Sequence, residues 1–589
     1  MKKNIIRIIE GILIIFNIYF HNMIKFSNIS LYLFLFLIIV LFEYTNNKKI
    51  NLTTKIFSVV LSLIFTLGNI SIVKYKSNVL EILIILVELF GSYYLFNRLL
   101  VVLEEWFSKL NITTNNKKIN KRKFMLISST IGFLCLLPYF LKYYPGIVSN
   151  DSYWQLTQAM KLTTYSDHHP WVHTLFIKLF YDIGMILTGK THIGVALYTI
   201  FQMIFASLTF SYVVYTLYNN KINKYIVVLV WMFFFLLPYN GIYSVTMWKD
   251  IPFSYITLIL TTFLLDHYRN KLSWNKQSKI IFTILTFFFA LFRSNGFIAY
   301  IIFLLILFIL YRKEFKVLKW SILISFCLIM IVKIPLSKIF NVSSPDFVES
   351  LSIPLQQIVY VIDNNGSISE DELKELSKIC DLKRIKEDRK DFISNPIKWN
   401  IRDNDKEHYL EKNKLKFLKL WISLGIKNPK QYWIAYVKQT SGYWYHNYGK
   451  YWVYVETHVT DGDYGNYELF NNNFLPKKIS KILDLGLDIN STIHYKLWSN
   501  AMGFYLIIIS LFIMIKKKRN ILALIPTLAV VLTLLIATPV ANEFRYSYCV
   551  FLCFIVILLY SLINDNYDEG SFKNEGKRKT KDSCFNTVL

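Results

Sequence analysis

Residues 221–250 read KINKYIVVLVWMFFFLLPYNGIYSVTMWKD, and this stretch shows the pattern that repeats along the chain. An apolar block at 225–240 stands between a basic turn and the pair Lys249-Asp250. Similar blocks of about 15 to 25 residues, long enough to cross a hydrocarbon layer as helices, recur along the chain. With 54% apolar and 18% charged side chains in 589 residues, the composition excludes a disordered or collagen-like chain. We therefore predict an all-α polytopic membrane protein.

The apolar blocks predict about 14 transmembrane helices, with both chain ends in the cytoplasm. Clusters of Lys and Arg then fall in alternate turns, as the positive-inside rule requires. One further block, Trp171–Leu187, would reverse this alternation if it crossed, so we interpret it as a helix that lies along the outer surface or dips in and out. The predicted crossings are residues 5–20, 29–43, 56–73, 79–103, 124–142, 191–217, 225–240, 251–266, 280–293, 296–311, 318–335, 498–515, 520–537 and 546–563.

The crossings divide the chain into five regions. The only long polar stretch contains the charged run Ser369–Lys390, whose acidic first turn suits a helix dipole and predicts a mainly helical extracytoplasmic domain. The regions are 1–123 (added helices and a basic cytoplasmic loop), 124–335 (a transmembrane core whose first outer loop is 143–190), 336–497 (the extracytoplasmic domain), 498–563 (the last three helices) and 564–589 (a basic cytoplasmic tail expected to be disordered).

The formal net charge of +27 does not indicate nucleic acid binding, because most Lys and Arg stand in short clusters between apolar blocks. Of the six cysteines only Cys380 lies in the extracytoplasmic domain, so no disulfide can close within it. The chain also lacks a phosphate-binding Gly-Lys loop and a dinucleotide fingerprint.

Unusual polar residues collect on the predicted outer side. The inner turns contain almost only Lys and Arg, whereas the outer turns mix acids, bases and histidines, so we expect the outer face to carry the function. These residues are Asp151, Asp167, His168, His169, Lys249, Asp250, Arg293, Asn295, Glu543 and Arg545.

The first outer loop carries Asp151 and, further on, His168-His169-Pro170. A carboxylate can deprotonate an acceptor hydroxyl or hold a divalent cation, and imidazoles can bind a phosphate or relay its proton. In the alternative interpretation Asp151 only caps a helix that begins at Ser152. Zinc at Asp167, His168 and His169 is not favoured, because three adjacent ligands cannot easily surround one ion.

The other candidates each have two interpretations. Lys249 can reach a lipid phosphate while Asp250 orients it, or it is an interface lysine beside an acid that starts a helix. Arg293 offers a planar donor fork to phosphate, or caps helix carbonyls in its tight turn. Glu543 and Arg545 form a surface ion pair, or Arg545 holds a carrier phosphate.

Aromatic side chains are dense between residues 432 and 452. Flat rings with polar tips stack on sugar faces, and they also belong at membrane interfaces. The run is therefore compatible with a glycan acceptor, and membrane-belt packing is the alternative for most of its members, which are Tyr432, Trp433, Tyr436, Tyr443, Trp444, Tyr445, Tyr448, Tyr451 and Trp452.

These motifs resemble a known class of membrane enzymes. The loop with Asn150-Asp151 and Asp167-His168-His169-Pro170 resembles the first external loop of GT-C glycosyltransferases, which include protein O-mannosyltransferases and the aminoarabinose transferase of lipid A. The stretches Ser352–Ile358, Thr440–Tyr445 and Asn542–Tyr546 look like those of an uncharacterised bacterial family of GT-C-like polytopic membrane proteins. The resemblance covers residues 124–563.

The resemblance implies a glycosyltransferase in the bacterial cytoplasmic membrane that moves a sugar from a polyprenyl-phosphate donor to an extracytoplasmic glycan, lipid or protein. Asp151 would be the catalytic residue, and a divalent cation, Mg or Mn, at Asp151 stays open. The residues expected to bind donor phosphate or acceptor are His168, His169, Lys249, Asp250, Arg293, Glu543 and Arg545.

Two other classes of membrane function stay open. A lipid-linked glycan flippase or transporter would need ionisable residues near the membrane midplane, and the apolar blocks contain few outside the first four helices. A glycan polymerase or ligase would use a different outer loop, and the sequence separates it poorly from a transferase.

Overall fold

The computed structural model describes residues 8–16, 28–70, 78–114, 117–445, 469, 472–497, 499–537, 540–541 and 543–563. Within these ranges every regular element is a helix, and the only β contacts are isolated bridges, which confirms the all-α prediction. The predicted tail 564–589, both ends of the predicted crossing 5–20, and Asn542 lie outside the described residues.

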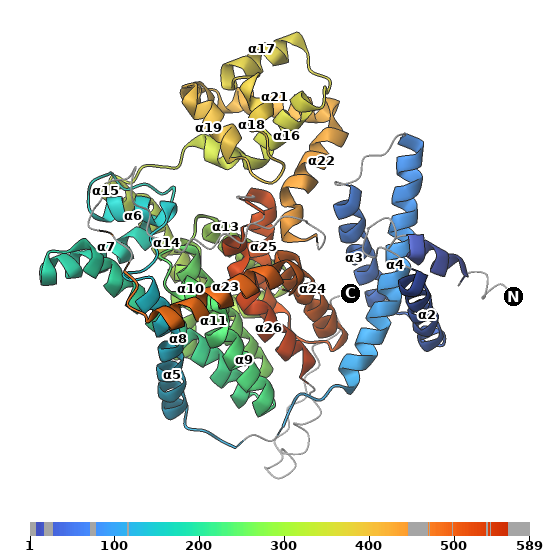
Figure 1. Cartoon of the computed structure of the whole chain (residues 1–589), viewed down its shortest axis with the longest axis horizontal. Coiled ribbons are helices and arrows are strands. Elements are labelled where there is room, and N and C mark those ends of the chain that lie inside the picture. Colours follow the sequence, from blue (N-terminus) through green and yellow to red (C-terminus); the bar gives the residue numbers. More distant parts are fainter. Residues whose placement is uncertain are drawn as a thin grey trace.

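A bundle of steep helices forms the centre of the molecule (Figure 1) and shares one large hydrophobic core. Its helices form where the sequence places apolar blocks. They are α5 (Lys121–Lys142), α8 (Thr191–Asn219), α9 (Lys224–Leu236), α10 (Pro238–Ser244), α11 (Asp250–Arg269), α12 (Lys276–Leu291), α13 (Ser294–Leu310), α14 (Arg312–Ile331), α24 (Asn500–Lys516), α25 (Ile525–Ala537) and α26 (Tyr548–Leu562).

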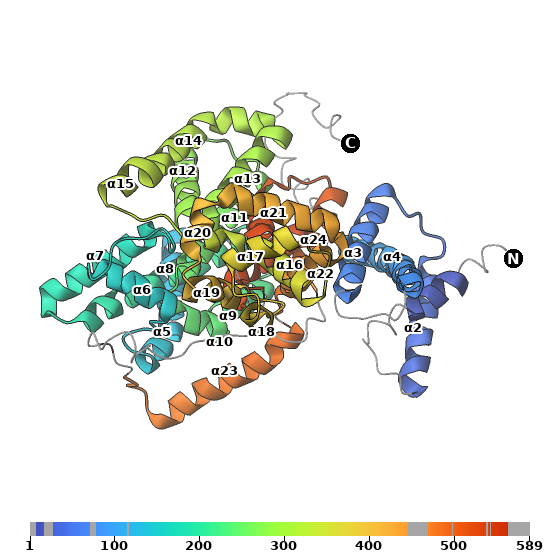
Figure 2. The same cartoon turned by 90° about the horizontal axis from the view of Figure 1, so that it is seen from above.

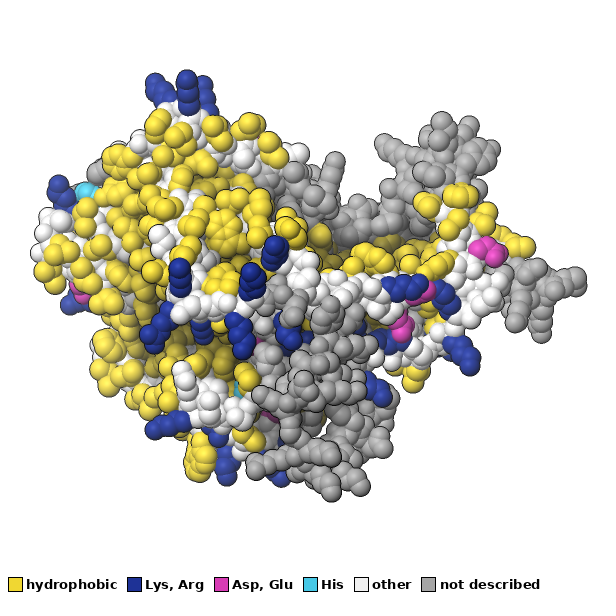
Figure 3. Space-filling view, turned by 90° about the horizontal axis from the view of Figure 1, so that it is seen from below, with side chains coloured by type: hydrophobic (Ala, Val, Ile, Leu, Met, Phe, Trp, Pro, Cys, Tyr) yellow, Lys and Arg dark blue, Asp and Glu magenta, His cyan; other side chains and the backbone are white. Residues whose placement is uncertain are grey.

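Among the described residues, six helices are long and apolar enough to cross a membrane. The number becomes seven if α9 and α10, which meet at a 49° bend beside Pro238, form one broken span. Broad parts of the surface carry hydrophobic side chains (Figure 3), which suits contact with lipid. The molecule is therefore a helical protein with several membrane-spanning candidates, and about 14 crossings stay a prediction.

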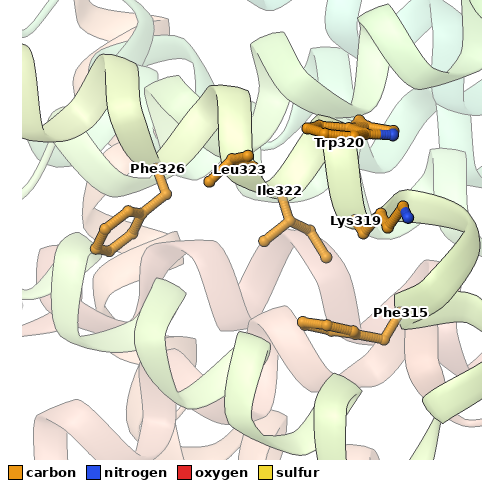
Figure 4. A pocket seen from close by; sticks show the side chains of 6 residues that line it. All are labelled: Phe315, Lys319, Trp320, Ile322, Leu323 and Phe326. Atoms are coloured by element: carbon orange, nitrogen blue, oxygen red, sulfur yellow. The ribbon is translucent and has the colours of Figure 1, made fainter.

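One apolar hollow lies on the outside of α14. It has a volume of about 390 Å³ and is lined by Phe315, Lys319, Trp320, Ile322, Leu323 and Phe326 (Figure 4). Because almost its whole lining is apolar, it suits lipid contact and not a polar substrate.

Three N-terminal helices, α2 (Asn28–Thr45), α3 (Leu52–Ile70) and α4 (Asn78–Lys109), stand beside the bundle (Figure 1). At one end of α4, Glu104 pairs with Lys516 Nζ of α24 at 2.7 Å. Within the group, Arg98 Nη2 pairs with Glu10 Oε2 at 2.9 Å, and both side chains are largely buried. The group also packs on the bundle, because Leu61 and Leu100 belong to its hydrophobic core and the rings of Phe57 and Phe512 lie 5.3 Å apart.

The segment between α14 and α24 builds a separate helical unit above the bundle (Figure 1) with its own core, from Val348 to Tyr432. Ser369 and Glu372 form a capping box at the start of α17, as its acidic first turn indicates. The single predicted run Ser369–Lys390 is two helices, because the backbone becomes extended at Cys380. The unit contains α16 (Ser352–Asp363), α17 (Glu370–Ile379), α18 (Arg384–Asp388), α19 (Asn395–Asp403), α20 (Glu407–Lys412), α21 (Lys414–Lys427) and α22 (Pro429–Thr440).

Two helices extend sideways from the bundle. In Figures 1 and 2, α7 (Trp171–Thr188) points away from it, next to the short α6 (Asn150–Ala159), while α23 (Lys477–Leu497) lies along another side in Figure 2. By length and composition α7 could also span a membrane, so its interpretation as a surface helix stays a prediction.

Candidate functional site

Two loops that follow different helices are joined at the upper end of the bundle. The amide of Ile147 donates to Val245 O at 2.8 Å, and the amide of Met247 donates to Ile147 O at 3.0 Å. Gly146 permits this approach, since its φ is +133° and a Cβ there would lie 2.2 Å from Thr199 Oγ1. The bridge brings the start of α6 next to the start of α11.

Side-chain hydrogen bonds fix both loops. The buried Gln202 amide of α8 donates to the carbonyls of Tyr243, Ser244 and Thr246 at 2.8 to 3.1 Å. Ser152 Oγ donates to Met247 O at 2.8 Å. Such satisfied buried networks hold a backbone in one arrangement.

Asp151 is not the cap of its helix, as the alternative interpretation had it. Helix α6 begins at Asn150, one residue before Asp151, and its N-cap residue is Ser149. The Asp151 carboxylate instead faces two cations, with Oδ2 2.8 Å from Lys249 Nζ and 3.0 Å from Arg545 Nη1. These partners lie 98 and 394 residues away in the sequence.

Both cations have further partners. Lys249 Nζ lies 2.9 Å from His169 Nδ1. Arg545 Nε donates to Glu543 Oε2 at 2.7 Å, and its guanidinium stacks 4.8 Å from the ring centre of Trp248. Five of the predicted residues thus form one connected network.

A second ion pair lies beside this network. Arg293 Nε is 3.1 Å from Asp250 Oδ1, and both side chains are at most 5% exposed. Arg293 also donates to Tyr546 O at 2.9 Å, which places it next to Arg545. Removing one partner of such a buried pair costs about 3–5 kcal/mol. Neither Asp250 oxygen has a well-aligned hydrogen-bond donor among the described residues, so this carboxylate can accept from a ligand hydroxyl.

Charges set the protonation of the site. Burial disfavours the charged form of Asp151, but Arg545 and Lys249 outweigh it and hold the pKa of this carboxyl well below its usual range. Burial, reinforced by Lys249, holds the pKa of His169 well below its ordinary 6.5. At neutral pH the site therefore contains an ionised Asp151 and a neutral His169.

His168 lies at the edge of the site. It is exposed, and its ring centre is 4.6 Å from that of His169. Its neighbour Asp167 pairs with Lys333 at 3.4 Å and takes no part in the network. Loss of hydration beside the protein lowers the pKa of His168. The negative charge of Glu349 in the upper unit opposes this shift, and the positive charge of Lys249 adds to it. The upper unit therefore reaches the site's rim through Glu349.

The residues fit a divalent cation poorly. Within the described ranges no three His, Cys, Asp or Glu side chains stand together as a metal site. Asp151, the predicted ligand, already faces two cations that would repel a third.

Part of the aromatic run lines a groove on the upper unit. The groove has a volume of about 540 Å³ and lies between α21 and α22, where Trp421, Tyr432, Trp433 and Tyr436 contribute rings. Tyr443, Trp444 and Tyr445 are buried instead. Tyr448, Tyr451 and Trp452 lie outside the described residues.

Sequence reasoning did not single out several residues that build the site. Gln202, Trp248, Glu349 and Tyr546 are the main ones. A glutamine inside an apolar block is a usable signal for the first, because buried amides need partners. The other three carry no such signal in the sequence.

A family model described as "Family of unknown function (DUF6020)" matches residues 159–577. The matched range holds every predicted site residue except Asp151, which lies eight positions before it. No curated protein and no solved structure matches the chain.

Proposed function

Because the chain belongs to DUF6020, a family of unknown function, we propose its activity from the site itself. We propose a GT-C-type glycosyltransferase that moves a sugar from a polyprenyl-phosphate donor to an acceptor outside the bacterial cytoplasmic membrane. The observation that carries the proposal is the Asp151 carboxylate held between Lys249 and Arg545 at the end of a membrane bundle.

The cations suit a lipid phosphate. Lys249 and Arg545 are nearly buried, and their charges are balanced by carboxylates that a phosphate can replace. Arg293 adds a third cation nearby. In the proposed resting state, Asp151 occupies the place that donor phosphate oxygens take on binding.

This exchange gives Asp151 its role. Once the phosphate takes over the two cations, the carboxylate loses the charges that depress its pKa and becomes a better base. It then accepts the proton of the acceptor hydroxyl while that oxygen forms a bond to the anomeric carbon. The bond from this carbon to the phosphate oxygen breaks, and polyprenyl phosphate leaves with its charge held by Lys249 and Arg545.

Other residues have supporting roles in the proposal. Neutral His169 accepts a hydrogen bond from Lys249 and so orients its ammonium group. Asp250, whose oxygens have no well-aligned donor beside the ion pair with Arg293, offers a carboxylate oxygen to a sugar hydroxyl. Glu543 holds the guanidinium of Arg545 in place, and the exposed His168 reaches an acceptor or the phosphate. No divalent cation is required by this scheme.

A lipid-linked glycan flippase is the second candidate. The observation in its favour is the Glu10–Arg98 ion pair, which is largely buried among the added N-terminal helices. A glycan polymerase or ligase would use the same phosphate chemistry, and its acceptor alone would distinguish it.

The test compares a deletion strain complemented with wild type, Asp151→Asn or Asp182→Asn. Asp182 is the matched control, because it forms a partly exposed ion pair with Lys178 one turn away on α7. Mass analysis of polyprenyl-phosphate sugars and envelope glycans is the measurement.

We expect the deletion to remove one sugar from a glycan and to accumulate its lipid-linked donor, and we expect wild type and Asp182→Asn to restore it. Full complementation by Asp151→Asn contradicts the proposed role of Asp151. Donor that accumulates only on the cytoplasmic side supports the flippase.

A further inference from the structure

Helix α23 carries three different faces, and no role has been assigned to it so far. With a turn of about 100° per residue, its side chains sort into three sectors. One sector packs on the bundle, one is exposed and polar, and one is exposed and apolar.

The contacts of the packed sector fix the position of α23 along the length of the bundle. Ser480 and Leu487 are buried, and Ser480 O accepts a hydrogen bond from Lys142 Nζ at 3.0 Å. Lys142, the last residue of α5, also forms an ion pair with Asp484. On the other side α23 contacts α10, where Gly486 faces Pro238. The helix therefore lies at the ends of α5 and α10, where the helices leave the predicted membrane layer.

The apolar sector consists of four aliphatic side chains that nothing described covers. Ile479, Ile482, Leu485 and Ile489 are 44%, 67%, 59% and 50% exposed. Their spacing of three, three and four residues places them on one face of the helix. The polar sector, with Lys481 and Asp488, turns to another side. A helix with this division is typical of the membrane interface.

The lysines add a charge argument. Lys477, Lys478 and Lys481 occupy the first five residues of α23, at the end of a helix where positive charge is unfavourable. All three are exposed, and no acidic side chain among the described residues pairs with them. Anions outside the protein are needed to balance them.

We propose that α23 lies flat in the headgroup layer of the membrane leaflet on the side of the Asp151 site. Its apolar sector enters the acyl boundary, its lysines bind anionic phospholipid headgroups, and Asp488 on the polar sector faces water. The proposal does not depend on the glycosyltransferase activity. In this arrangement α23 sets how deep the Asp151 site lies relative to the membrane, because Lys142 connects α23 to the loop that carries Asp151.

The test uses the full chain in vesicles of phosphatidylcholine with or without phosphatidylglycerol. An environment-sensitive fluorophore is attached at Ile482→Cys or, as the matched control on the same helix, at Asp488→Cys. The exposed Cys327 and the tail Cys584 are replaced by Ser in both proteins. Lipids with a quencher at the upper acyl chain report depth.

We expect quenching at position 482 to exceed that at 488 by at least about twofold. Equal quenching at both positions overturns the proposal. Protection of 482 from both lipid and water, with cross-links between copies through this cysteine, also overturns it and assigns the face to a second copy of the chain.

A second variant tests the lysines separately. Replacing Lys477, Lys478 and Lys481 with Gln leaves the packed sector intact, so the fold is expected to persist. We expect phosphatidylglycerol to deepen the label at 482 in the parent and not in this variant. An unchanged response to phosphatidylglycerol overturns the headgroup assignment.

Discussion

Asp151 and Glu349 are each held by one lysine and one arginine. Asp151 lies 2.8 Å from Lys249 and 3.0 Å from Arg545, and Glu349 in the upper unit lies 2.7 Å from both Lys398 and Arg402. The two clusters match in charge and in distances. They differ in how the chain supplies their members.

The cations of Glu349 come from one helix turn of α19, and Arg402 has further acidic neighbours in Asp346 and Glu407. Such a cluster docks one helix on its neighbour. The cations of Asp151 come from two segments far apart in sequence, and a neutral His169 and the ion pair of Asp250 with Arg293 stand beside them. Similar ion triads therefore support different interpretations, because only the Asp151 triad has a histidine beside its lysine and a further buried ion pair next to it.

The largest effect is expected for Asp151→Asn compared with Glu349→Gln. Asn keeps the shape of Asp151 but cannot accept a proton, so we expect a loss of transfer of about 10²–10⁴-fold. Glu349→Gln leaves the largely buried Lys398 without its carboxylate, which should lower the unfolding temperature and leave turnover per folded protein near wild type. Transfer assays and thermal unfolding of the same purified samples measure both. A catalytic loss in Glu349→Gln that equals the loss in Asp151→Asn would show that the two clusters do not differ in function.

Arginine-to-lysine exchange should give the next largest difference. Arg545 bridges Asp151 and Glu543 through separate nitrogens, which a single ammonium cannot do, so we expect Arg545→Lys to lose about 10- to 100-fold in transfer. Arg402→Lys, at a partly exposed docking pair, should stay within about twofold. Steady-state kinetics on both variants tests this, and an active Arg545→Lys argues against a positioned guanidinium.

Acid should affect the two clusters in different pH windows. The pKa of His169 lies below its ordinary 6.5, so the unfolded chain takes up a proton that the folded site refuses, and stability falls as pH drops below about 6.5. Burial opposes ionisation of Glu349, but Lys398 and Arg402 lower its pKa to about 2, so its contribution is complete above its ordinary 4.5 and is lost only as pH falls through about 2.

Hydrogen exchange at pH 7 and pH 5.5 can separate these windows. Peptides around residue 169 should lose protection at the lower pH, and peptides around residue 349 should not. His169→Gln is the control that should remove the effect. Equal loss in both regions would mean that global unfolding, not the site, responds to acid.

The smallest effect is expected for metal removal. Because two cations already neutralise Asp151, we expect EDTA to change the transfer rate by less than about twofold. An EDTA-sensitive rate that Mg or Mn restores would instead make Asp151 a metal ligand in the substrate complex.

Much of the site followed from the sequence because two strong rules agree. Apolar blocks predicted where helices form, and the alternation of basic turns put Asp151, Lys249 and Arg545 on one side. The alternation of basic turns predicts on which side of the membrane a residue lies, but it does not predict the distances between residues on that side. Nothing in the sequence pairs Arg293 with Asp250 rather than with a helix end, or Arg545 with two acids at once.

The rest depends on tertiary contacts between distant segments. The bridge of Ile147 to Val245 and Met247 consists of main-chain hydrogen bonds, which the pattern of side chains in the sequence does not predict. The position of Glu349 depends on how the upper unit sits on the bundle, and its neighbours Val348 and Ser350 give no sign of it in the sequence. The break at Cys380 was missed for the same reason, because charge patterns do not locate a change to extended backbone.

The 394 residues between Asp151 and Arg545 also impose an order on biosynthesis. A ribosome delivers Asp151 and Lys249 early, and Arg545 follows only when almost the whole chain has been made. A product truncated between residues 250 and 544 has Lys249 but not Arg545 for its Asp151. Premature chains therefore lack the arginine that completes the cluster, and only nearly full-length protein can assemble it.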